Sequence, residues 1–475
     1  MKPIKAIDAA FLQLETAATP MHVGALFVLE PATGQDRRTF FRRFKQEVRR
    51  ALGSSEIFTR RVATLPFGLA NPLWVTADVD LEYHVRRTAL PHPGTQHQLE
   101  ECVADLHAPR MDTSRPLWEL HVIEGLQDGR LAMYIKTHHA GLDGASAQIF
   151  LMSFVAAGHP ADASKRRQSR PPPPPPGENP TPGELLSAAL RHQAAQLAEL
   201  PALAKRLGGS ASDALQELRA TLASLAASDG AAPRTPLNVA ISGARSFASV
   251  ECDLATVKGL AKAHGATVND LVMAACAGAL RRWLLLHDAL PGQPLKAAVP
   301  VSTREAGNTD QSIQVSFMSV NLHTDVEDAR DRLAAIHASA LESKRSAAKV
   351  QALLPDDLPS FGLPWLLAGV ARALTRPGVI DRLPLPANVI ISNVAGPPAA
   401  LYVAGARAVT YSPVSIPYHG CALNITVYSY DGKLFFGLTA ARNTLPDLRD
   451  LADGITAEIA MLAAPARPRR ARKAR

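Results

Sequence analysis

The chain has 475 residues, 47% of them hydrophobic and 20% charged, and its formal net charge is +8 at pH 7. This length exceeds what one ordinary hydrophobic core organises, so we expect two domains, and the composition is typical of a soluble globular protein. No run of 18 or more apolar residues occurs, which argues against a transmembrane helix, and the opening residues lack the apolar stretch of a secretory signal.

Most of the net positive charge lies at the C-terminal end. Residues 465–475, PARPRRARKAR, hold six Lys and Arg residues and no acid, so the rest of the chain carries only +2. We expect this tail to be disordered. It could contact the phosphate groups of an anionic membrane or of nucleic acid, or it could act only as a solubilising segment without a dedicated partner.

The spacing of the cysteines and the absence of common sequence motifs argue against several kinds of functional site. The four cysteines, Cys102, Cys252, Cys276 and Cys421, show no CxxC spacing. This argues against a disulfide framework and a zinc site, and it suits a reducing cytosol. The sequence contains no GxxxxGK loop, no GxGxxG after a strand and no GxSxG turn, so it lacks the common phosphate-binding and nucleophile motifs.

The N-terminal part alternates between helix and strand patterns. We expect an amphipathic helix beginning at Asp8, with the Glu15 charge on its solvated face, and strands over residues 21–30 and 129–138. Residues 37–53 show the three- and four-residue apolar spacing of a helix, with Gly53 past its end. Its expected apolar face consists of Phe41, Phe44, Val48 and Ala51.

A proline-rich segment, KRRQSRPPPPPPGENPTPG (165–183), marks the clearest boundary. Six consecutive prolines form a stiff polyproline II rod, which does not run through a packed domain. Two amphipathic helices are expected next. The first covers residues 186–207 with a break at Pro201, and the second follows a capping box at residues 210–213. These helices either pack on a domain surface or face a membrane.

The second half again mixes helices and strands. We expect helices over residues 253–265 and 267–288, and a β-hairpin over residues 422–440 that turns at Asp431-Gly432. The resulting segments are an N-terminal domain (1–160), a linker with the proline rod and amphipathic helices (161–234), a C-terminal domain (235–464) and the basic tail (465–475).

The stretch KTHHAGLDGAS (136–146) places two adjacent histidines between an expected strand and an expected helix. Asp143 could serve only as the helix N-cap, and one histidine could be a satisfied core residue. Adjacent residues after a strand point to opposite faces, so the pair is poorly placed to share one metal ion. A neutral imidazole is suited to general-base work, and His139 has Asp143 four residues later across the turn.

HHAGLDG resembles the HHxxxDG motif of the CoA-dependent acyltransferase superfamily, and PLWELHVIEG (116–125) resembles the PLWxxxxxEG motif of bacterial wax ester synthase/acyl-CoA:diacylglycerol acyltransferases. The resemblance spans almost the whole chain and omits only the proline rod, parts of the linker helices and the tail. The further matching stretches, in the family's order, are residues 8–24, 90–94, 235–245, 267–274, 299–304, 388–397 and 422–430.

This resemblance implies an α/β fold of two chloramphenicol-acetyltransferase-like domains that form a pseudo-dimer with an interdomain tunnel. It assigns the general base to the second histidine, His139, beside His138. Asp143, followed by Gly144 in the motif, matches the family's structural aspartate. That aspartate pairs with an arginine from the other domain, for which Arg304 is the candidate.

The resemblance also implies donors for the tetrahedral intermediate. Asn269 lies in the first turn of the expected helix 267–288, where the helix dipole favours an oxyanion. The neighbouring Asp270 has a sufficient structural explanation as the partner of Thr267 in a capping box. Asn424 lies in an expected strand and either faces the tunnel or is structural.

The activity implied by the resemblance is transfer of a long-chain acyl group from acyl-CoA to a fatty alcohol, to diacylglycerol or to both. Acyl-CoA is then a substrate, and we expect no cofactor, no metal and no nucleic acid partner. We expect a cytoplasmic protein at the periphery of a membrane or lipid droplet. The alternatives are a carrier-protein-dependent, condensation-type acyltransferase and a non-catalytic lipid-droplet-binding protein of the same fold.

Overall fold

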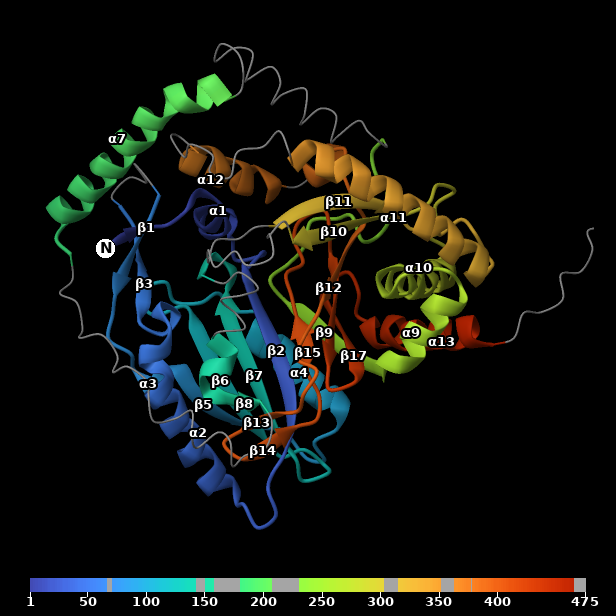
Figure 1. Ribbon diagram of the computed structural model, residues 1–475, viewed down its shortest axis with the longest axis horizontal. Coiled ribbons are helices and arrows are strands. Elements are labelled where there is room, and N and C mark those ends of the chain that lie inside the picture. Colours follow the sequence, from blue (N-terminus) through green and yellow to red (C-terminus); the bar gives the residue numbers. More distant parts are fainter. Residues whose placement is uncertain are drawn as a thin grey trace, which may run out of the picture.

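The computed structural model describes residues 1–65, 71–141, 150–157, 180–206, 230–302, 315–351, 363–376 and 378–464 (Figure 1). Within these residues the chain builds two large β-sheets with helices around them, together with a small three-stranded sheet. The mixed α/β architecture predicted from the sequence is therefore confirmed. No described helix combines the length and the hydropathy that crossing a lipid bilayer requires.

The first large sheet has the strand order β5-β6-β7-β2-β14-β13-β8, with β15 paired to β2 beside β14. Its central pair, β2 and β7, is antiparallel, and His22 lies directly opposite His138. The strands span Val85–Ala89 (β5), Trp118–Glu124 (β6), Leu131–His138 (β7), His22–Glu30 (β2), Ala406–Ala408 (β14), Leu401–Val403 (β13), Val155–Ala157 (β8) and Ser412–Val414 (β15).

Four helices and the small sheet accompany this first sheet. The helices span Ala6–Leu14 (α1), Arg37–Ala51 (α2), Leu81–His84 (α3) and Gln96–His107 (α4), and the small sheet consists of Lys2–Pro3 (β1), Leu73–Thr76 (β4) and Arg60–Ala63 (β3). The apolar face of α2 includes Phe40, which is fully buried, in place of the predicted Phe41. Phe41 lies at the margin of this face, where the guanidinium of Arg87 covers its ring at 5.2 Å.

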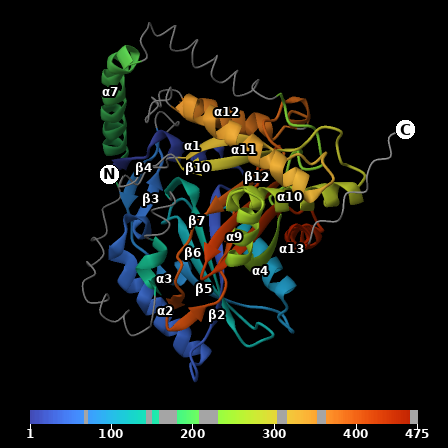
Figure 2. The same cartoon turned by 45° about the vertical axis from the view of Figure 1, so that its right-hand side comes forward.

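The second large sheet has the order β11-β10-β12-β16-β17-β9, and its helices gather on the side away from the first sheet (Figures 1 and 2). Its strands span Val315–Asn321 (β11), Lys296–Ser302 (β10), Val389–Val394 (β12), Leu423–Tyr430 (β16), Lys433–Ala441 (β17) and Arg245–Asp253 (β9). Its helices span Leu254–Ala263 (α9), Val268–Leu286 (α10), Ala329–Gln351 (α11) and Leu448–Ala463 (α13).

The local signals predicted for this half are confirmed. The Asp253 side chain accepts the N–H of Thr256 at the start of α9, and Thr267 and Asp270 form the expected capping box of α10. The β16–β17 hairpin turns at Asp431 and Gly432, both with positive φ, as a two-residue turn of this kind requires.

The linker helices are described only in part. Helix α7 spans Pro182–Arg206 and continues through Pro201, so the predicted break there is wrong. Proline removes one main-chain donor, which bends a helix without necessarily ending it. The proline rod, the second predicted helix and the basic tail lie outside the described residues. A separate helix, α12 (Leu363–Leu374), packs against α1.

The two halves are joined where residues 401–414 cross into the first sheet. Strand β15 pairs with β2 in the first sheet and also packs against β17 of the second. Polar contacts add to this junction: the Glu100 carboxylate accepts the N–H of Ser249 at 2.9 Å and pairs with Arg449. The buried guanidinium of Arg245 donates to the Ala18 carbonyl oxygen at 2.8 Å.

We predict that Gly437→Ala weakens this junction. A Cβ at Gly437 would lie 1.8 Å from the Pro413 carbonyl oxygen, so β15 or β17 would have to shift. Overpacking of this kind costs about 1–3 kcal/mol, which urea unfolding measures. The matched control is Gly259→Ala in α9, where nothing lies within 4 Å and alanine should stabilise the helix. Equal stability of Gly437→Ala and the unmodified protein would contradict the prediction.

Candidate active site

The two histidines lie at the end of β7 and in the short turn that follows it. Strand β7 ends at His138, and His139–Gly141 form a 3₁₀ turn. The main-chain N–H of His139 donates to the Met21 carbonyl oxygen at 2.9 Å, just before β2 begins. The turn is therefore fixed against β2, as expected for a functional loop placed on a strand end.

His138 is engaged in local structure. It is 1% exposed, and its Nδ1 accepts the N–H of Ala140 at 3.0 Å. Because Nδ1 accepts, Nε2 is the nitrogen left to donate, and it lies 3.5 Å from Glu15 Oε1. His138 thus stabilises the turn from one side.

Glu15 was expected on a solvated face, and this expectation is wrong. Its side chain is only 3% exposed. Its carboxylate accepts the Met21 N–H at 3.1 Å and the Arg110 Nε–H at 3.2 Å. Burial alone would raise the pKa of Glu15, but His138, the Met21 N–H and Arg110 together lower it. The periodicity of the helix gave no signal of this, because the residues that bury Glu15 come from distant segments.

His139 lies on the other side of the turn. Its ring stacks on Phe11 of α1, with centroids 4.1 Å apart and an interplanar angle of 17°. Among the described residues, Nδ1 of His139 makes no hydrogen bond to another residue. Burial, and then the neighbouring His138, lower the pKa of His139 to about 4. The imidazole is therefore neutral at pH 7 and can accept a proton.

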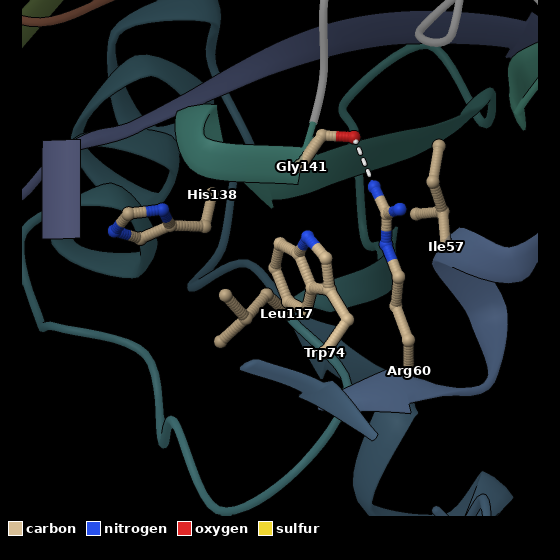
Figure 3. Close-up of a pocket in the computed structure, with 6 residues that line it drawn as sticks. All are labelled: Ile57, Arg60, Trp74, Leu117, His138 and Gly141. Atoms are coloured by element: carbon tan, nitrogen blue, oxygen red, sulfur yellow. Dashed lines mark hydrogen bonds between the residues drawn. The ribbon is translucent and has the colours of Figure 1, made fainter. Parts of the chain in front are cut away.

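A pocket opens beside the turn, and Figure 3 shows the six residues that line it. In this view the Trp74 ring lies between the His138 imidazole and the Arg60 side chain, and Arg60 donates to the Gly141 carbonyl oxygen at 3.0 Å. His138, and not His139, lines this pocket. The pocket residues are Ile57, Arg60, Trp74, Leu117, His138 and Gly141. Sequence analysis did not identify Arg60 or Trp74.

Two buried polar side chains, Lys136 and His107, lie near the end of β7. Lys136 is buried and donates to the carbonyl oxygens of Leu106 and Pro109, at 3.0 and 2.6 Å. Burial lowers the pKa of Lys136 to about 8. Nδ1 of His107 forms a hydrogen bond with the Tyr134 hydroxyl, and Nε2 of the same ring donates to the Ser415 carbonyl oxygen at 3.0 Å. These contacts fix the end of α4 against β7 and against the segment after β15.

The remaining predicted residues are not brought to the histidines by any described contact. Asn269 lies in the first turn of α10 and its amide contacts the sulfur of Met273 at 4.0 Å. Asn424 is buried, its amide donates to the Ile416 carbonyl oxygen at 3.2 Å, and its own oxygen accepts from Thr426. Asp143, Gly144 and Arg304 lie outside the described residues. Among the described residues, no cluster of His, Cys, Asp or Glu could hold a metal ion.

Comparison with known proteins gives consistent matches over both halves. The model of the wax ester synthase/diacylglycerol acyltransferase catalytic domain matches residues 4–272, and that of the WS/DGAT C-terminal domain matches residues 313–463. A Mycobacterium tuberculosis protein named as a probable diacylglycerol O-acyltransferase is 39% identical over 447 residues, covering 94% of this chain and 95% of its own.

Solved structures agree with these matches. The wax ester synthase/diacylglycerol acyltransferase from Marinobacter aquaeolei VT8 matches with a TM-score of 0.68 at 32% identity, covering 97% of this chain and 98% of its own. The first condensation domain of the calcium-dependent antibiotic synthetase matches with a TM-score of 0.57 at 14% identity, covering 98% and 97%, which shows a shared fold alone. The expected two-domain acyltransferase fold is thereby confirmed, whereas the interdomain tunnel stays a prediction.

We predict that Glu15→Gln destabilises the protein by about 1–3 kcal/mol at pH 7, because it removes a buried charge that three groups contact. The pKa of Glu15 is lowered on folding, so its contribution is full above the ordinary pKa of 4.5. That contribution is lost as pH falls through the lowered value. Urea unfolding at pH 7 and at pH 4 measures both effects.

The control for this prediction is Glu101→Gln on the exposed side of α4, where Glu101 lies 3.4 Å from His97. This exposed pair should change stability by no more than about 0.5 kcal/mol. If Glu15→Gln were as stable as Glu101→Gln at pH 7, the carboxylate would not hold the turn.

Proposed function

The chain belongs to the wax ester synthase/diacylglycerol acyltransferase family, and from this premise we propose that it transfers a long-chain acyl group from acyl-CoA to diacylglycerol, to a fatty alcohol or to both. The observation that carries the proposal is the turn His139–Gly141 at the end of β7, which begins within the HHxxxDG sequence motif and holds a neutral His139, in a chain that matches the family over nearly its whole length.

His139 serves as the general base in this proposal. Its imidazole takes the proton of the acceptor hydroxyl while that oxygen attacks the thioester carbonyl carbon. A tetrahedral intermediate forms, the carbon–sulfur bond breaks, and the CoA thiolate takes the proton back from the imidazolium. Protons and electrons balance without an acyl-enzyme, so one base serves both transfers. Exclusion of water prevents hydrolysis of the thioester.

His138 and the residues around it act by positioning His139. His138 and Glu15 hold the turn from one side, Arg60 holds the Gly141 carbonyl from another, and Phe11 limits rotation of the His139 ring. Holding hydroxyl and thioester in a productive geometry contributes ~7–11 kcal/mol in favourable cases. Pairing of Asp143 with Arg304, and a role for Gly144 in the turn, belong to the same proposal.

Stabilisation of the oxyanion is proposed for Asn269, since it lies at the start of a 19-residue helix where the dipole is positive. Asn424 is a weaker candidate, because its amide already holds the Ile416 carbonyl and Thr426. The contacts of Asn424 support a structural role for it in β16.

The alternatives are not favoured. Condensation domains match at 14% identity or less, which carries no information about substrate, whereas the acyltransferase relatives match at 32% and 39%. A non-catalytic lipid-droplet-binding protein would have no need of a neutral histidine held at this turn by buried partners.

We further propose that the protein works in the cytoplasm at the surface of a membrane or lipid droplet. Diacylglycerol and long-chain alcohols are mostly hydrocarbon, and each CH₂ removed from water contributes about 0.8 kcal/mol, so these acceptors collect in lipid. Leu186 and Leu190 of α7 and Val370 of α12 are exposed apolar side chains that could contact such a surface. The basic tail, residues 465–475, would add attraction to anionic lipid.

The proposal is tested by incubating the purified protein with palmitoyl-CoA and either hexadecanol or diolein, and following free CoA and the ester product. We expect CoA release that depends on an acceptor. His139→Ala should lower kcat by about 10²–10⁴-fold, because it removes the base.

The matched comparison is His138→Ala, which perturbs the turn but leaves the base and should retain measurable turnover. Equal losses in the two variants would contradict the assignment of the base to His139. Absence of CoA release with both acceptors would overturn the proposed function itself.

The pH dependence of kcat/KM provides a further prediction. The base must be unprotonated, so activity is lost on the acid side, as pH falls through the pKa of His139 at about 4. We expect kcat/KM to stay level from pH 8 to pH 5.5, measured by mass spectrometry of the ester. A histidine with the ordinary pKa of 6.5 would instead lose about tenfold by pH 5.5.

A further inference from the structure

Helix α2 (Arg37–Ala51) presents an almost purely basic surface to solvent. Its side against the first sheet, with Phe40, Phe44 and Val48, is fully buried. Figures 1 and 2 both show α2 at the lower left-hand edge of the molecule, outside the strands that it covers. All but one of its exposed residues are arginines; the exposed residues are Arg37, Arg38, Arg42, Gln46, Arg49 and Arg50.

Three of these arginines, Arg38, Arg42 and Arg49, form what we call the basic stripe. Residues four and seven apart lie on the same side of an α-helix, so the three side chains follow one another along the side of α2 that faces away from the sheet. At about 1.5 Å of rise per residue, the basic stripe is about 16 Å long.

The charge of the basic stripe is not neutralised by salt bridges. Within the residues that the structure describes, α2 forms two salt bridges, one between Arg43 and Glu47 and one between Lys45 and Glu82. No described acidic side chain forms a salt bridge with the basic stripe, although the exposed N-cap carboxylate of Asp36 lies close enough to act on one of its arginines electrostatically.

The charge of α2 also contrasts with that of the surrounding protein. Residues 37–51 contain seven Lys and Arg residues and one Glu, a net charge of +6. Because the chain without the tail 465–475 carries +2, the part outside both α2 and the tail carries −4. Positive charge is therefore concentrated at α2, and the electrostatic field would steer a negatively charged partner towards this helix.

The shape and composition of this surface favour one kind of anionic partner. Interfaces between proteins have an apolar or aromatic centre, but none of the exposed large apolar side chains of the described chain belongs to α2. A small anion requires a concave site with converging donors, whereas the basic stripe lies on the convex side of one helix. A lipid surface offers many phosphates in one plane, to which guanidinium groups bind well.

On these grounds we propose that Arg38, Arg42 and Arg49 of α2 form a docking surface for anionic phospholipid headgroups. Nucleic acid also carries phosphates, but the proposed acyl acceptors collect in lipid. The inference rests on the proposed function in this choice of partner alone, because the contact itself requires no substrate. It adds to the proposed lipid contacts of α7, α12 and the tail an electrostatic contact on a folded helix, which salt should weaken.

The experiment measures how much of the full-length protein sediments with lipid vesicles at about 0.15 M salt. The vesicles consist of phosphatidylcholine alone or of phosphatidylcholine with phosphatidylglycerol, which is anionic. The variant carries Arg38→Gln, Arg42→Gln and Arg49→Gln together, and glutamine keeps a helix propensity close to that of arginine. Each basic residue near an anionic surface contributes about fivefold in affinity. We expect the affinity for anionic vesicles to fall by about tenfold to hundredfold.

The matched control carries Lys258→Gln, Lys262→Gln and Arg282→Gln. It removes the same three charges, but from exposed positions on α9 and α10 of the second sheet, and it keeps the tail. This control should bind anionic vesicles nearly as well as the unmodified protein. Equal losses in the two variants would mean that only net charge matters. Equal binding of the unmodified protein to neutral and anionic vesicles would likewise overturn the docking surface.

Duplex DNA tests the competing partner under the same conditions. If the α2 variant lost more affinity for DNA than for anionic vesicles, α2 would be a nucleic acid surface and the lipid assignment would be wrong. A smaller loss with DNA supports the assignment to lipid.

Vesicle binding separates this inference from the proposed function, because it requires neither acyl-CoA nor acceptor. If the unmodified protein released no CoA with any acceptor, the proposed function would fail. The comparison of the α2 variant with its matched control would then still decide whether the basic stripe binds anionic lipid.

Discussion

The structure depends on how firmly one short turn is held. The turn His139–Gly141 follows a fully buried strand and has few atoms of its own to fix its shape. Three contacts constrain it: the Met21 carbonyl accepts from the His139 N–H, the side chain of the preceding residue His138 accepts from the Ala140 N–H, and Arg60 donates to the Gly141 carbonyl. Since an imidazole must meet its proton within hydrogen-bond distance, loosening any of these contacts would displace the proposed base, His139.

Burial gives the site its chemical character. The pKa of His139 is lowered to about 4 by removal from water, so the ring is ready to accept a proton across the physiological range. Glu15 is buried too, but it stays charged because His138, Met21 and Arg110 offset its desolvation. In the proposed reaction the same exclusion of water would protect the thioester from hydrolysis.

The two halves of the chain contribute different parts of the structure around the histidine turn. All the described contacts that hold the histidine turn come from the N-terminal half, whereas the C-terminal half supplies strands β13–β15 to the first sheet and the long helix α10. Strand β15 packs on both sheets, and His107 of α4 contacts the carbonyl of Ser415 just after it. The two halves are therefore held together close to the buried polar side chains of His107 and Lys136.

The sequence by itself determined the local elements and the motif. Periodicity and capping residues predicted α9, α10 and the Asp431-Gly432 hairpin, because these signals act between residues close in the chain. Only the tertiary structure decided that Glu15 is buried, that Arg60 and Trp74 share a pocket with His138, and that residues 401–414 join the first sheet. Burial and charge environment are set by neighbours distant in sequence, and no local pattern encodes them.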